Sequence, residues 1–124
     1  MRRITIILLV CCLQPLAAAA QLRLPSVIAD GMILQRNSTV RLWGKAAPST
    51  PVRITTGWAT GSIEVNASLS GDWSAEIPTA GAGGPYTVEI TSGTERRTLQ
   101  NVLLGEVWIC AGQSNMSMPI RGFE

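Results

Sequence analysis

The chain has 124 residues, of which 15% are charged, with ten basic and eight acidic side chains and no histidine. This length fits one domain, or one domain with part of another. Two of the basic residues are Arg2 and Arg3, so the remainder is neutral and lacks the basic stripe with interleaved aromatic residues that a nucleic-acid surface needs.

The first twenty residues have the three parts of a secretory signal peptide. Two arginines precede an apolar run at 4–13, a proline interrupts it, and four alanines at 17–20 offer a cleavage site before Gln21. A membrane anchor or a buried strand is the alternative, but the run is shorter than the roughly 20 residues that cross a bilayer. We therefore expect cleavage after Ala20 and export of the protein to a periplasm or the extracellular space. We expect no membrane association after cleavage.

Cleavage there would also remove two of the three cysteines, Cys11 and Cys12. One remaining cysteine cannot form a disulfide framework. Cys110 lies inside an apolar run, so we expect a small buried side chain rather than a nucleophile.

Residues 21–104 are predicted to form short strands separated by turns. Apolar and polar residues alternate with a period of two, and no helical pattern is present. The expected strands are 24–28, 32–34, 39–43, 52–55, 62–67, 73–77, 86–90 and 97–104, with a hairpin turn at Asp30-Gly31 and a flexible glycine-rich loop at 80–85. This pattern predicts an all-β antiparallel sandwich of the jelly-roll or immunoglobulin-like kind.

Three tryptophans in this region bear on function, because an exposed aromatic platform could bind sugars. Trp43 and Trp73 fit the inward phase of their strands, so we expect both in the core. Trp58 lies in a turn between two glycines and is the one expected at the surface.

The pattern changes near Gly105. The run Val107–Ala111 is continuously apolar, as in a strand that is covered on both faces within a parallel sheet. Open α/β sheets bind their ligands at the carboxyl ends of such strands. Ser114 follows this run, so its hydroxyl could cap a helix or act as a nucleophile with its own N–H donating to an oxyanion. The local pattern alone favours the helix cap.

The stretch "GEVWICAGQSNMSMP" resembles the first conserved block of the sialate O-acetylesterase family, within the SGNH (GDSL-like) hydrolases. Upstream, the stretches "LPSVIADGMILQR", "VRLWGKAAPSTPVRI", "GDWSAEIP" and "AGGPYTVEI" resemble the N-terminal sandwich of that family, in the same order. The resemblance covers nearly all of the chain after residue 20.

This resemblance implies that Ser114 is the acyl-accepting nucleophile and that its backbone N–H donates to the oxyanion. Gln113, which stands where many related hydrolases carry an aspartate, and Asn115 and Met116 are then substrate-binding residues. The substrate would be an O-acetylated sugar, either a sialic acid or a related acetylated sugar. No cofactor or metal is expected.

A serine hydroxyl needs a neighbouring base to take its proton. Because the chain has no histidine, the Asp-x-x-His motif that supplies the base in this family is expected outside these residues. Residues 105–124 are then expected to be the first strand and nucleophile turn of an incomplete α/β SGNH domain, and the chain by itself is expected to be inactive. The alternative is a non-catalytic exported sandwich that binds a glycan or a protein partner.

Overall fold

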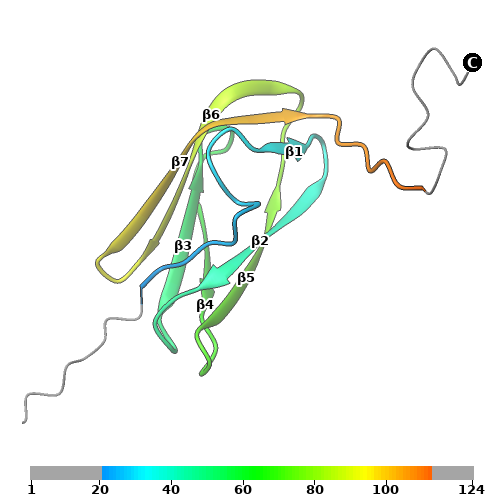
Figure 1. The fold of residues 1–124 in the computed structure, drawn as a ribbon. Coiled ribbons are helices and arrows are strands. Elements are labelled where there is room, and N and C mark those ends of the chain that lie inside the picture. Colours follow the sequence, from blue (N-terminus) through cyan, green and yellow to red (C-terminus); the bar gives the residue numbers. More distant parts are fainter. Residues whose placement is uncertain (1–20, 113–124) are drawn as a thin grey trace, which may run out of the picture.

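The computed structural model describes residues 21–112 (Figure 1). The predicted signal peptide at 1–20 lies outside the described residues. The strands are β1 (Ile33–Gln35), β2 (Thr39–Lys45), β3 (Pro51–Thr56), β4 (Ser62–Asn66), β5 (Asp72–Pro78), β6 (Gly83–Ser92) and β7 (Glu95–Gly105). The described part of the chain contains no helix, and so none that could cross a membrane. The predicted all-β class is confirmed.

The strands form two sheets that share one core. The larger sheet has the order β1-β7-β6-β3-β4, and β2 pairs with β5 in the smaller one. Figure 1 shows the β2–β5 pair beside the larger sheet. All neighbouring strands are antiparallel except β1 and β7, which run parallel with Ile33 opposite Leu103. The prediction of a purely antiparallel sandwich is therefore wrong at this edge.

Alternating side chains build the core, as the sequence predicts for half-buried strands. Every second residue of β3 and of β5 is buried. The largest fully buried side chains come from both sheets and from the segment before β1: Leu22, Leu42, Val52, Ile54, Ile77, Val88, Ile90 and Val102. Each contributes roughly 1.5–3 kcal/mol through the apolar surface that it removes from water.

The segment before β1 differs from the prediction. Residues 24–28 form no strand, and Arg23 makes only an isolated antiparallel bridge to Lys45. The turn at Asp30-Gly31 exists, but it does not close a hairpin. Its partner is Gln100 of β7, whose N–H donates to Asp30 Oδ1 and whose carbonyl accepts the Gly31 N–H, both at 2.9 Å. These bonds bring β1 to the edge of β7.

Trp43 lies opposite to its predicted position, and Trp58 is less exposed than predicted. Trp73 is buried as predicted, but Trp43 is 44% exposed on the outer face of β2. Trp58 is half-buried, and its Nε1 donates to the Pro78 carbonyl at 3.0 Å. The inward positions of β2 belong to Val40, Leu42 and Gly44, which leaves Trp43 on the opposite face.

The glycine-rich loop is shorter than predicted. β6 already begins at Gly83, which is paired with Leu104 of β7, and the register shifts before Tyr86 and again before Val88. Such bulges bend a strand locally and increase its twist. The part of the predicted loop after residue 82 is therefore an irregular strand end.

Candidate functional site

The predicted site residues Gln113, Ser114, Asn115 and Met116 lie outside the described residues. The structure does describe the segment that leads to them, from the end of β7 to Gly112. The described part of the candidate site is the set of contacts that hold this segment on the sandwich.

Two residues at the end of β1 hold the end of β7. The Arg36 N–H donates to the Gly105 carbonyl at 2.9 Å. The Glu106 carboxylate accepts hydrogen bonds from Arg36 Nε at 2.6 Å and from Gln35 Nε2 at 2.9 Å. The Gln35 side chain also accepts the Val107 N–H through Oε1 at 2.8 Å. We call this arrangement of Gln35 and Arg36 around residues 105–107 the Gln35–Arg36 clamp.

The clamp is held by directed hydrogen bonds more than by charge. Arg36 and Glu106 are both about half exposed, so solvent screens their attraction. The hydrogen bond from Gln35, followed by the one from Arg36, lowers the pKa of Glu106 below its ordinary value. Glu106 is therefore ionised near neutral pH, which is the form that accepts both hydrogen bonds.

The clamp residues were not among the predicted site residues. A signal was present, since Gln35 and Arg36 end one family-like stretch, "LPSVIADGMILQR", and residues 105–107 begin another. About 70 residues separate the two stretches in sequence, and the clamp joins them in space. The parallel pairing of β1 with β7 makes this contact possible, because both strands end at the same edge of the sheet.

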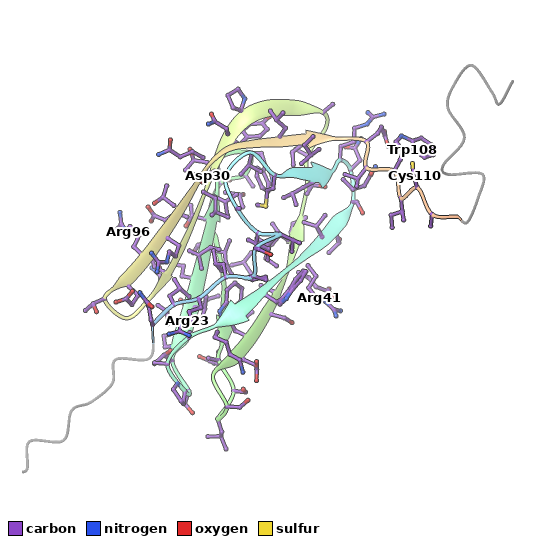
Figure 2. All side chains as sticks on the ribbon, viewed as in Figure 1. Arg23, Asp30, Arg41, Arg96, Trp108 and Cys110 are labelled. Atoms are coloured by element: carbon purple, nitrogen blue, oxygen red, sulfur yellow. The ribbon has the colours of Figure 1, made fainter. Side chains whose placement is uncertain are left out.

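After the clamp, the chain leaves the sandwich. Residues 106–112 form no strand, and Trp108 and Ile109 are 84% and 92% exposed. Figure 2 shows Trp108 and Cys110 beyond the end of β7, away from the sheets. The predicted strand at Val107–Ala111 is thus not present in the structure. The prediction of a buried Cys110 is wrong, because no described strand pairs with this segment and covers it.

The described residues support a site but do not themselves form a set of catalytic groups. Five carboxylates form surface ion pairs with basic side chains: Arg36–Glu106, Arg41–Glu76, Lys45–Asp72, Arg53–Glu64 and Arg96–Glu89. Residues 21–112 hold no group of three or more histidine, cysteine, aspartate or glutamate side chains that could bind a metal.

Known proteins are similar to this chain in sequence and in fold. No protein-family model matches it. It is 32% identical to a sialate O-acetylesterase of Mus musculus over 93% of this chain and 23% of that protein. The corresponding protein of Homo sapiens is 28% identical over 84% of this chain and 22% of its own length.

A solved structure agrees with these sequence relatives. A carbohydrate acetylesterase from Xanthomonas citri matches with a TM-score of 0.65 and 30% identity, over 70% of this chain and 20% of that one. The sandwich is therefore a fold found within a carbohydrate acetylesterase. The chain itself is homologous to the sialate O-acetylesterases over most of its length, which confirms the resemblance seen in the sequence. It spans about a fifth of the length of these relatives.

Proposed function

We propose that the chain is part of an exported serine esterase that removes O-acetyl groups from sialic acids or related acetylated sugars. The observation that carries the proposal is the similarity to a sialate O-acetylesterase over 93% of the chain. The matching fold of a carbohydrate acetylesterase supports the same class of substrate.

In the proposed reaction, Ser114 Oγ attacks the carbonyl carbon of the acetyl group while a base takes the hydroxyl proton. The tetrahedral oxyanion accepts a hydrogen bond from the Ser114 N–H. The bond to the sugar oxygen then breaks, the sugar hydroxyl leaves with the proton from the base, and water hydrolyses the acetyl-serine to acetate. Because this chain has no histidine, we propose that the base is a histidine outside these 124 residues.

The sandwich would hold the start of the segment that leads to the nucleophile. The Gln35–Arg36 clamp fixes the backbone at Val107, seven residues before Ser114. The reaction rate falls steeply when a catalytic group is displaced, so fixing the backbone before the Ser114 motif favours catalysis. Gln113, Asn115 and Met116 are proposed to line the pocket that receives the acetylated sugar.

Substitution of Ser114 tests the proposal. In the product of the whole reading frame that contains this chain, Ser114→Ala should lower kcat by about 10³-fold or more, as in other serine esterases and proteases. Ser117→Ala, in the same motif, is the matched control and should retain most of the activity. Rates would be measured with a chromogenic acetyl ester and with an O-acetylated sialic acid. Near wild-type turnover of Ser114→Ala would end the assignment.

The 124-residue chain provides a second arm of that experiment. It should be as inactive as the substituted enzyme, because a serine without a base keeps its proton. Turnover by this chain that disappears in Ser114→Ala would show that the base lies within these residues after all.

We further propose that residues 1–20 direct export and are removed after Ala20. The mature protein should then begin at Gln21, which mass spectrometry of the secreted or periplasmic fraction would detect. Recovery of the chain with Met1 in a membrane fraction would contradict the proposal.

A further inference from the structure

The outer face of the β2–β5 pair carries a tryptophan between charged side chains. In the antiparallel register, Trp43 lies opposite Ser74 and Lys45 lies opposite Asp72. On the other side of β2, the backbone of Arg23 pairs with that of Lys45 in an isolated antiparallel β-bridge. Side chains two residues apart, or directly opposite each other, share one face of a sheet. We call the surface made by these five residues the Trp43 face.

The Trp43 face is hollowed beside the indole ring. The hollow has a volume of about 260 Å³ and opens to solvent. Its lining includes Trp43, Arg23, Lys45 and Asp72, together with Pro25. The hollow therefore combines an aromatic surface with positively and negatively charged hydrogen-bonding groups. Small-ligand sites combine apolar and polar groups in the same way.

The charged groups of this face do not cancel. Lys45 Nζ lies 2.5 Å from Asp72 Oδ1, and Ser70 Oγ donates to the other oxygen of Asp72 at 2.6 Å. The hydrogen bond from Lys45, followed by the one from Ser70, lowers the pKa of Asp72, so this carboxylate stays ionised at neutral pH. Among the described residues Arg23 forms no ion pair. The face therefore carries one unbalanced positive charge.

The neighbouring row of the same face is also polar. Arg41 lies two residues before Trp43 and pairs with Glu76 of β5 at 3.6 Å. Figure 2 shows Arg41 outside the β2–β5 pair and Arg23 beside the lower part of β2. Polar groups on both sides of the indole suit a hydroxylated ligand better than an apolar protein surface, because an apolar partner would leave these groups buried without hydrogen bonds.

From this arrangement we propose that the Trp43 face binds a sugar that carries a carboxylate. The apolar C–H face of the pyranose ring packs on the indole of Trp43, which supplies dispersion contacts and removes apolar surface from water. The carboxylate pairs with Arg23, and ring hydroxyls exchange hydrogen bonds with Lys45 and Asp72. This binding site does not involve Ser114, so it would operate whether or not the chain contributes to an esterase.

A titration followed by NMR tests the site on the 124-residue chain. The chain has four tryptophans, so its four indole N–H resonances report on four separate places. On addition of sialyllactose, the Trp43 resonance should shift and those of Trp58, Trp73 and Trp108 should stay in place. We expect a dissociation constant on the order of 1 mM, as for a small, open site. Lactose, the same sugar without the acidic residue, should bind about ten-fold more weakly.

Three variants connect the shift to the proposed contacts. Trp43→Ala should abolish the shifts of the Lys45 and Asp72 amides, while Trp43→Tyr should keep them in weakened form. Trp108→Ala removes a tryptophan that is more exposed than Trp43 but lies off this face, and it should bind like the parent chain. Arg23→Gln should reduce sialyllactose binding to the level of lactose. An unchanged Trp73 resonance would show that each variant is folded.

Several results would overturn the proposal. One is a Trp43 resonance that does not move up to about 50 mM sialyllactose. Another is equal affinity for lactose and sialyllactose, which would remove the role of Arg23. A Trp43 shift that depends on protein concentration without any sugar would show that a second copy of the chain covers this face. The esterase assignment is tested by turnover and this site by the indole resonances of the 124-residue chain, so the failure of one can be told apart from the failure of the other.

Discussion

Gly44 leaves room for the buried tryptophan of the β2–β5 pair. It occupies an inward position on β2, directly opposite Trp73. A Cβ at this position would lie 3.1 Å from the Trp73 ring and would also meet the Arg23 carbonyl oxygen. The missing side chain therefore leaves room for the buried indole of Trp73, while Trp43 takes the outward position next to it.

Gly44→Ala should lower the free energy of unfolding by about 1–3 kcal/mol, because the added methyl group meets a backbone atom and a packed ring. Gly81→Ala is the matched control, since the nearest atom to a Cβ there is 4.0 Å away. Urea unfolding monitored by tryptophan fluorescence would compare the two. Equal stability of the two variants would mean that the space next to Trp73 is not filled as described.

The Glu106 carboxylate makes the stability of the clamp depend on pH. Because its folded-state pKa is lowered, its contribution to stability is fully present above the ordinary glutamate pKa of about 4.3 and is lost as the pH falls through the lowered value. Gln35→Ala removes the hydrogen bond from Gln35, which is the larger of the two that lower the pKa of Glu106. This pKa should therefore rise toward its ordinary value. NMR titration of the Glu106 carboxyl carbon would measure this, with Gln100→Ala as a control outside the clamp. An unchanged titration in Gln35→Ala would contradict the assigned hydrogen bond.

At the scale of elements, β3 and β6 form the centre of the larger sheet. Ile54 of β3 lies directly opposite Ile90 of β6, and both side chains are buried. β1, in contrast, is a three-residue edge strand whose Ile33 is 54% exposed. The stability of the sandwich should therefore depend on β3 and β6 much more than on β1, whose role is to place the clamp.

The same substitution on the two strands tests this difference. Ile54→Ala should destabilise the chain by about 2–5 kcal/mol, because it leaves a cavity in the core. Ile33→Ala should cost less than about 1 kcal/mol, because solvent already reaches that side chain. Midpoints of urea unfolding would measure both. A larger loss for Ile33 than for Ile54 would show that the edge strand, and not the central pair, carries the stability.

At the scale of the whole molecule, the chain has a packed part and an exposed part. The sandwich ends at the clamp, and the apolar side chains that follow it are exposed to solvent, an arrangement typical of surfaces that other protein surfaces cover. In Figure 1 the segment after β7 leads away from both sheets.

Amide hydrogen exchange should map this division. Amides of β3, β5 and β6 should be protected, because their hydrogen bonds break only when the core opens. Amides of residues 108–112 should exchange at nearly unfolded rates, and the Val107 amide should be slower because it donates to Gln35. In Gln35→Ala the Val107 amide should exchange as fast as the amides of residues 108–112. Protection at Ile109 as strong as at Ile54 would contradict the exposed segment.

Much of this protein could be predicted from its sequence, because the relevant information is local. Period-two alternation gave β2 to β7 within a few residues, since each strand buries one side of its own backbone. The motif around Ser114 led to the esterase family, and the similarity to sialate O-acetylesterases confirms that resemblance. The roles of Ser114 and its neighbours remain predictions.

Tertiary structure decided which partner each residue has. Val40 and Leu42 take the inward positions of β2, so Trp43 lies outward and its predicted burial used the wrong phase of the strand. The sequence also does not show that Gly44 lies opposite Trp73 and leaves room for its ring. The Asp30-Gly31 turn has a hairpin signature, but its hydrogen bonds go to Gln100 of β7. Gln35 and Glu106 are 71 residues apart and meet only because β1 runs parallel to β7. Such contacts depend on long-range pairing, and a local pattern carries no information about it.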